Sequence, residues 1–174
     1  MILLINMTFE PTNKNNIKAL CVLARKIWTE HYTPIIGKAQ VEYMLEKFHS
    51  EEAISNQIKN EGISYYLLKM KGKYVGYIAF QERNGKSELF LSKFYILSGH
   101  RGQGYGREAM EFIEKAAMDR NLGKIILTVN KNNCSAIKVY EKMGFEKKGS
   151  VVKDIGGGFI MDDYIMQKQT GISG

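Results

Sequence analysis

The residues best suited to chemistry lie in one glycine-rich segment of the 174-residue chain, which reads Arg-Gly-Gln-Gly-Tyr-Gly and stands between an apolar run and a helical pattern. Glycines at alternate positions allow sharp turns and let a ligand approach the backbone amides. Amides that lead into a helix N-terminus bind phosphate, and an arginine adds a forked cation. The segment therefore predicts a phosphate-binding turn. Its residues are Arg101, Gly102, Gln103, Gly104, Tyr105 and Gly106.

Two common phosphate-binding loops are excluded by the residues that follow this turn. A P-loop requires Gly-Lys and then Ser or Thr, but Gly106 is followed by Arg107 and Glu108. A dinucleotide fingerprint that starts at Gly102 requires Gly or Ala at position 107. Taken alone, the motif is also compatible with a glycine-rich strand-to-helix turn that binds no ligand.

A second motif, at residues 133–145, reads N-x-x-A-x-x-x-Y-x-x-x-G-F. With the turn at 101–106, which matches an R/Q-x-x-G-x-G/A loop, it makes the chain resemble the GNAT superfamily of acetyl-CoA-dependent N-acetyltransferases. The resemblance covers roughly residues 62–168. It implies an enzyme that takes acetyl-CoA as the acetyl donor and transfers the acetyl group to an amine.

The fold expected from this resemblance is one α/β domain over residues 1–174, in which a single mixed central β-sheet is flanked by helices. The order strand, helix, strand over 89–130 predicts a parallel, right-handed β-α-β crossover at the cofactor site. Pro34 predicts a helix break within 32–37. Hydrophobic periodicity predicts strands near 1–9, 63–70, 74–81, 89–97, 124–130, 145–154 and 159–167, and helices near 17–31, 38–60, 104–121 and 132–143.

Composition limits the remaining possibilities. The two cysteines, Cys21 and Cys134, and the three scattered histidines show no metal-ligand spacing, so we expect no metal and a reducing, cytoplasmic location. The apolar start lacks the basic region and cleavage site of a signal peptide, and no membrane partner is expected. The formal charge of +7 favours an anionic ligand. The lysine-rich stretch 131–153 keeps a nucleic-acid-binding module open, although no nucleic-acid-reading motif is present and no nucleic-acid partner is expected.

The resemblance also implies which residues bind the cofactor. The backbone of Tyr95, Ile96 and Leu97 is expected to pair with the pantetheine arm, with one N–H acting as an oxyanion donor. Ordinary sheet pairing accounts for the same residues without a ligand. Asn133 is expected to contact the cofactor and also to cap the following helix.

Tyr140 is predicted to be the general acid that protonates the departing coenzyme A thiolate. Packing between sheet and helix is the alternative for its ring. Glu88 is the candidate general base, acting through water, with a solvated glutamate at a strand end as its alternative. Ser92 and Lys93 occupy the part of the strand where relatives offer a polar or acidic group, so a chain of waters without one fixed base is also open.

The acceptor is a small-molecule primary amine, for which Trp28, Glu30 and Tyr32 are the predicted substrate-binding residues. A weaker similarity to PaiA-like polyamine acetyltransferases suggests a polyamine of the spermidine or spermine type, with Glu30, Glu42, Asp162 and Asp163 as possible carboxylates; the positive charge of the chain opposes a polycation. A peptide or protein amine, an amino-sugar and a non-catalytic acyl-CoA-binding protein stay open. A homodimer is suggested by family analogy alone.

Overall fold

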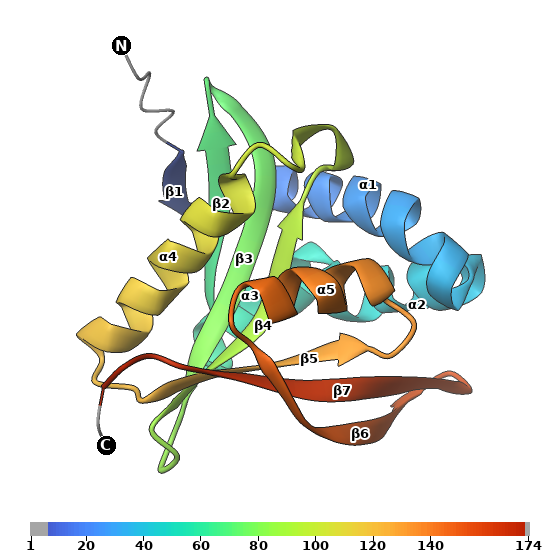
Figure 1. Cartoon of the computed structure of the whole chain (residues 1–174). Helices are drawn as coiled ribbons and strands as arrows, with labels where there is room; N and C mark the ends of the chain where they lie inside the picture. The colour runs from blue at the N-terminus through green and yellow to red at the C-terminus, as the bar shows by residue number, and fades with distance from the viewer. Residues whose placement is uncertain (1–6, 173–174) are drawn as a thin grey trace. The chain divides into compact units, whose positions relative to one another are not determined.

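The structure is a computed structural model, which describes residues 7–172 (Figure 1). The first strand, β1, comprises Thr8–Pro11. The part of the predicted N-terminal strand at residues 1–6 lies outside the described residues.

Within the described residues 7–172, seven strands form one mixed sheet in the order β1-β2-β3-β4-β5-β7-β6 (Figure 1). The β4–β5 pair is parallel, whereas β1–β2, β2–β3, β5–β7 and β6–β7 are antiparallel. A single helix, α4, connects the two parallel strands. The predicted fold class is therefore confirmed. The strands after β1 are β2 Ser64–Met70, β3 Lys73–Arg83, β4 Glu88–Ile96, β5 Lys124–Asn130, β6 Glu146–Gly156 and β7 Phe159–Gln169.

The chain divides into two compact units. The first unit comprises Met1–Phe80 and Lys93–Met110, and the second comprises Gln81–Ser92 and Glu111–Gly174. The assignment of residues 1–174 to a single domain stays a prediction.

The first unit contains three consecutive helices, α1 Ile17–Ile36, α2 Lys38–His49 and α3 Glu51–Asn60. Apolar residues at helical spacing on α1 and α3 pack against alternate residues of β2 and β3, as expected for amphipathic helices on a sheet. The fully buried members of this core are Leu20, Ala24, Ile54, Leu67, Tyr77 and Ala79.

The predicted break at residues 32–37 is wrong in position, because α1 continues through Pro34 to Ile36. A proline inside a helix removes one N–H donor but can be tolerated where packing holds the helix. Here the ring of Tyr32 stacks on Trp28 with 4.4 Å between centroids. The turn comes at Gly37, whose φ of 85° lies in the left-handed region and whose N–H donates to the Thr33 carbonyl at 3.0 Å.

The second unit is built on β5, β6 and β7 with α5, Cys134–Lys142, and the later turns of α4, Tyr105–Asp119. Two ion pairs join β7 and β6 to these helices: Lys168 with Glu114 on α4, and Lys147 with Glu141 on α5. Both pairs identify the sheet face that the helices cover. A short 3₁₀ turn, η1 Ser98–His100, belongs to the first unit.

Candidate cofactor and catalytic site

The predicted phosphate-binding turn has the backbone that its glycines require. Gly102 and Gly104 adopt φ values of 73° and 87°, and a Cβ at either position would meet no atom within 4 Å. The turn is therefore open as well as left-handed. Helix α4 begins directly after it at Tyr105, and the Gly104 carbonyl accepts from the Glu108 N–H at 3.1 Å. The first N–H groups of a helix lack intrahelical acceptors, so this turn fits a phosphate group.

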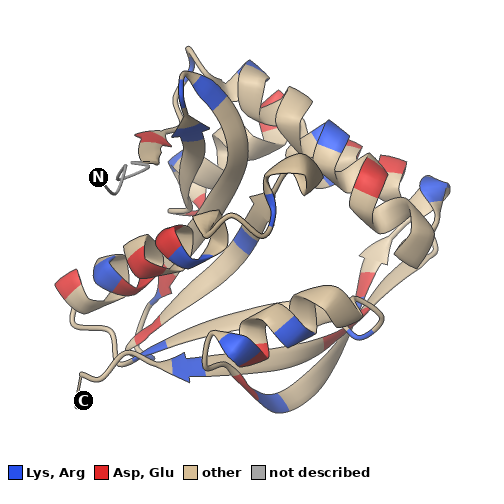
Figure 2. Ribbon diagram, turned by 45° about the horizontal axis from the view of Figure 1, so that its top comes forward, with Lys and Arg blue, Asp and Glu red and all other residues tan. Residues whose placement is uncertain are grey.

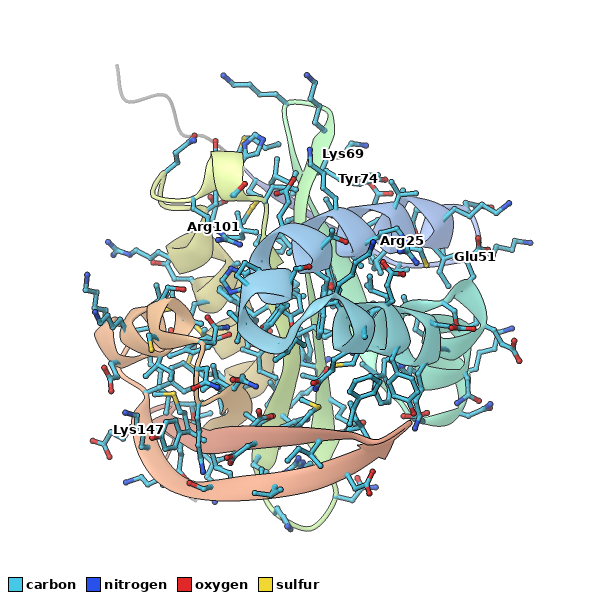
Figure 3. All side chains as sticks on the ribbon, turned by 90° about the vertical axis from the view of Figure 1, so that its right-hand side faces the viewer. Arg25, Glu51, Lys69, Tyr74, Arg101 and Lys147 are labelled. Atoms are coloured by element: carbon cyan, nitrogen blue, oxygen red, sulfur yellow. The ribbon has the colours of Figure 1, made fainter. Side chains whose placement is uncertain are left out.

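Arg101 is anchored at one end of its guanidinium (Figure 3). Its Nε donates to the Ile96 carbonyl at 3.0 Å, and one terminal nitrogen lies 3.5 Å from His31 Nδ1. The residue is exposed, so the guanidinium is oriented without being enclosed. Glu30, next to His31, accepts from the Ser98 hydroxyl at 3.3 Å. The later part of α1 thus contacts the segment that leads into the turn.

The parallel ladder between β4 and β5 is short. It consists of three pairs, from Glu88 with Lys124 to Phe90 with Ile126. After this point β5 continues to pair with β7 as far as Asn130. These pairs of the parallel ladder therefore end before the residues that are predicted to pair with the pantetheine arm.

The backbone groups of Tyr95 and Ile96, at the end of β4, and of Leu97, directly after it, point in different directions. The Leu97 N–H donates to the Val75 carbonyl at 2.8 Å and is therefore used within the fold. A Cβ on Gly76 would lie 2.3 Å from the Tyr95 carbonyl oxygen, which thus faces β3. Because successive residues of a strand direct their backbone groups to opposite sides, the N–H of Ile96 points away from β3.

Trp28 and Tyr32 belong to an aromatic cluster with Tyr95 and Tyr77. The Tyr95 ring lies 5.6 Å from Trp28, 6.0 Å from Tyr32 and 5.2 Å from Tyr77. Trp28 is only 5% exposed, and its Nε1–H donates to the Tyr77 hydroxyl at 3.0 Å. Trp28 therefore belongs to the core, whereas Tyr32 and Tyr95 are partly exposed.

His49 is a buried polar residue that sequence reasoning missed. The Tyr77 hydroxyl accepts from Trp28 Nε1–H and lies within hydrogen-bond distance of His49 Nε2, at 3.2 Å. Burial, reinforced by the charge of Lys93, lowers the pKa of His49 well below its usual value. The ring is therefore neutral at pH 7. No apolar or polar pattern on α2 distinguishes this histidine from a surface one.

From the sequence, Lys93 is notable only because relatives offer a polar or acidic group in this part of the strand. In the structure, the surroundings of its ammonium group are unusual. Its Nζ lies 5.5 Å from the centre of the Tyr65 ring. Burial lowers the pKa of Lys93 to about 8, while the charge of Glu61 opposes that change.

Asn133 and Tyr140 lie on the second unit. Asn133 is buried and caps α5: its side chain accepts from the Ala136 N–H at 3.4 Å, as predicted. Tyr140, in the last turn of α5, is partly exposed, and its ring packs edge-on against Phe145 at 5.6 Å. The helix and this ring contact fix the direction of the tyrosine side chain.

Glu88 is buried with two cations at the start of β4. Its carboxylate lies 3.4 Å from Arg83 and 3.5 Å from Lys124. These ion pairs account for the burial of Glu88, which is 6% exposed, without a role in catalysis. Its assignment as general base stays a prediction.

Residues 7–172 contain no group of three His, Cys, Asp or Glu side chains placed to hold a metal ion. Within the same residues no helix is long and apolar enough to cross a membrane.

A comparison with protein-family models matches residues 24–145 to the acetyltransferase (GNAT) family. This match covers more than half of the chain. The chain belongs to the GNAT family. Acetyl-CoA is the acetyl donor of that family, and the open turn before α4 fits the phosphate groups of such a donor.

Curated relatives are N-acetyltransferases of low identity. N-acetyltransferase 8B of Mus musculus is 25% identical over 140 residues, which cover 78% of this chain and 56% of the mouse protein. N-acetyltransferase family 8 member 2 of Rattus norvegicus is 28% identical over 100 residues, covering 55% of this chain and 44% of the rat protein. The chain thus spans about half the length of these relatives.

Solved structures share the fold over nearly the whole chain. PaiA N-acetyltransferase from Thermoplasma acidophilum, in complex with coenzyme A, aligns with a TM-score of 0.76 and 18% identity, over 94% of this chain and 99% of that one. Spermidine N-acetyltransferase from Vibrio cholerae, in complex with CoA and spermine, aligns with a TM-score of 0.68 and 18% identity, over 95% of this chain and 96% of that one. At these identities the likeness shows the GNAT fold.

Proposed function

We propose that this chain is an N-acetyltransferase that uses acetyl-CoA to acetylate a primary amine. The observation that carries the proposal is the open, left-handed turn at Gly102 and Gly104, which leads directly into α4. Membership of the GNAT family supports the same donor.

Acetyl-CoA supplies the activated acetyl thioester. In the proposal, Arg101 and the amides from Gly102 to Gly106 bind its phosphate groups, and Asn133 adds a further contact. The N–H of Ile96 donates to the acetyl carbonyl oxygen and so stabilises the negative charge that develops there. Tyr95 and Leu97 flank this donor, and the Leu97 N–H holds the segment on β3 through its bond to the Val75 carbonyl.

Tyr140 donates its proton to the departing thiolate. A free thiol has a pKa of about 8.5, so protonation at sulfur eases its departure. A positioned acid of this kind accelerates a reaction by about 10² to 10⁴. The acceptor must also lose a proton, and Glu88 acting through water is the base that the sequence suggested.

The acceptor class in this proposal is a small primary amine, with polyamines as the first candidates to test. The two structural neighbours described above are named as a PaiA N-acetyltransferase and a spermidine N-acetyltransferase. Glu30 is exposed and offers a carboxylate to a cation, Tyr32 offers a partly exposed ring, and Trp28 supports Tyr32 from the core. The formal charge of +7 weighs against a polycation at long range. The cytoplasmic location and a homodimer stay predictions.

The proposed donor site is tested by calorimetric titration of acetyl-CoA. The double variant Arg101→Ala, Gly104→Val removes the cation and forces a side chain into a left-handed position. We expect its affinity to fall by at least about 100-fold. Arg25→Ala, at an exposed arginine paired with Glu42, is the control and should bind as the unmodified chain does. Absence of binding to the unmodified chain would overturn the proposal.

A nucleic-acid-binding module is the alternative from another class. Figure 2 shows that basic and acidic residues are interspersed along α4. A mixture of this kind weakens the field that a polyanion would follow. Salt-sensitive binding to oligonucleotides, without binding to acetyl-CoA, is the result that would favour the alternative.

A further inference from the structure

Asp163 is a buried carboxylate that the arrangement above leaves unexplained. It lies in the middle of β7 and is 3% exposed. Its Oδ1 has no hydrogen-bond partner among the residues that the structure describes. A buried polar atom without a partner destabilises a fold by about 1–3 kcal/mol, and more when the group is charged. Such an atom therefore needs a partner that the described residues do not supply.

The neighbouring aspartate, Asp162, is in the opposite situation. It is about half exposed, and it pairs with Lys131 at 2.6 Å. Lys131 also lies 5.5 Å from the ring of Tyr164, and Lys147, labelled in Figure 3, lies 4.7 Å from the same ring. Because Lys147 pairs with Glu141 on α5, Asp162 and Tyr164 belong to the sheet face that α5 covers.

Asp163 therefore belongs to the other face of the sheet, since neighbouring residues of a strand point to opposite sides. It stands opposite Asn130 on β5 and Val151 on β6. Thr128, two residues before Asn130 and on the same face, hydrogen-bonds to the Asp163 carboxylate. The Lys131 ammonium is held by Asp162 on the face that α5 covers.

The surroundings keep Asp163 ready to exchange a proton. Burial and, to a smaller extent, the charge of Asp162 raise its pKa from 3.8 to about 6, while the Thr128 hydrogen bond and the charge of Lys131 lower it. At pH 7 the carboxylate is mostly ionised and has one buried oxygen without a donor. An ammonium group would supply both the missing hydrogen bond and the missing positive charge.

We propose that Asp163 binds the ammonium group of the acceptor amine and removes its proton before acetyl transfer. This inference rests on the proposed acetyltransferase function and names its base and its acceptor class, a primary alkylammonium. Asp163 would then replace Glu88, which is already paired with Arg83 and Lys124.

The proposed step balances as follows. The ammonium R–NH₃⁺ gives one proton to the Asp163 carboxylate and becomes R–NH₂. The nitrogen lone pair forms the C–N bond with the acetyl carbon, and the C–S bond breaks with its electrons on sulfur. Tyr140 protonates the sulfur and is reprotonated by the proton that the new amide loses; Asp163 returns its own proton to water. One proton is released for each acetyl group transferred.

The test compares Asp163→Asn with Asp119→Asn, which makes the same chemical change at an exposed aspartate that pairs with Lys115 on α4. The probes are propylamine, spermidine, a peptide with a free lysine and glucosamine, each with acetyl-CoA, and turnover is measured as thiol release. We expect Asp163→Asn to lower kcat/KM for the amine by at least about 100-fold while acetyl-CoA binding, measured by calorimetry, is unchanged. Asp119→Asn should stay within about threefold of the unmodified chain.

The pH profile separates a base from a structural residue. Without Asp163 the amine must lose its proton in solution, so kcat/KM of Asp163→Asn should rise about tenfold for each pH unit between pH 7 and 9. Thr128→Val, which removes a hydrogen bond that lowers the pKa of Asp163, should move the acidic limb of the unmodified profile to higher pH. This second variant provides the test if Asp163→Asn fails to fold.

The outcomes are distinguishable. If the unmodified chain does not bind acetyl-CoA, the proposed function itself fails. Binding without turnover of any of the four amines would overturn the acceptor class and the inference together. Turnover by Asp163→Asn equal to that of Asp119→Asn, or a Thr128→Val profile that does not move, would overturn the inference and leave the acetyltransferase function standing.

Discussion

Asp163 gives a prediction about stability that does not depend on knowing the substrate. Its carboxylate is buried, and burial is the main reason why its pKa is raised from 3.8 to about 6. The native state therefore holds the proton more tightly than the unfolded chain does. Replacing Asp163 with Asn removes the buried charge while keeping the shape of the side chain.

The magnitude follows from the two pKa values. A difference from 3.8 to about 6 corresponds to about 3 kcal/mol, at 1.36 kcal/mol for each pH unit. Since the native pKa is the higher one, the ionised carboxylate lowers stability as pH rises through this interval, and the loss is complete above about pH 7. About 2.5 kcal/mol of this loss in unfolding free energy occurs between pH 4 and pH 8.

The assay is urea unfolding without ligand, followed by circular dichroism at pH 4 and pH 8. We expect the gain in unfolding free energy from Asp163→Asn to be about 2.5 kcal/mol larger at pH 8 than at pH 4. Comparing two pH values removes any constant effect of the new amide. Asp162→Asn, at an exposed ion pair, should change stability by less than about 1 kcal/mol at both pH values.

A gain that is the same at both pH values, or larger at pH 4, would refute the reasoning. It would mean that the Asp163 carboxylate is not held in a surrounding that penalises its charge. The argument for a missing ammonium partner would then lose its electrostatic basis.

Three further predictions concern the strands and α5. Gly76→Ala places a Cβ 2.3 Å from the Tyr95 carbonyl oxygen and should lower the free energy of unfolding by about 1–3 kcal/mol. The control Gly149→Ala makes only a 3.9 Å contact with a flexible side chain and should lower it by less than about 1 kcal/mol. Equal losses in urea unfolding would contradict the close approach at Gly76. Tyr77→Phe leaves a buried indole N–H and an imidazole nitrogen unpaired and should cost about 2–4 kcal/mol in the same assay, so a loss below about 0.5 kcal/mol would show that this network is not formed. Tyr140→Phe should lower kcat by at least about 100-fold with unchanged acetyl-CoA affinity in calorimetry, and full activity in this variant would exclude the tyrosine as the acid.

Local sequence determined the elements and the glycine-rich turn before α4. Gly102 and Gly104 have the left-handed φ values that their spacing predicted, because only glycine adopts them without strain. Asn133 caps α5 as expected, since a side-chain cap depends on residues three apart in the chain. The order of strands and helices, and with it the parallel β4–β5 pair, also follows from local patterns and chain connection rules.

The position of the α1 end could not be predicted from the sequence alone. Pro34 favours a break wherever it stands, but the stacking of Tyr32 on Trp28 holds the helix until Gly37. Trp28 was predicted to bind the substrate, but the sequence does not show that its side chain is buried in the structure. Aromatic residues on a helix suit both a binding surface and a core, and the partner strands decide between them.

Tertiary structure alone decided which polar atoms have partners. The Leu97 N–H is used by Val75, which leaves Ile96 as the donor that points away from β3. Asp162 and Asp163 are identical and adjacent in the sequence, yet one is paired with Lys131 and the other is buried with an oxygen that has no hydrogen-bond partner within residues 7–172. Strand alternation sends them to opposite faces of the sheet, and what each face offers comes from residues far away in the chain.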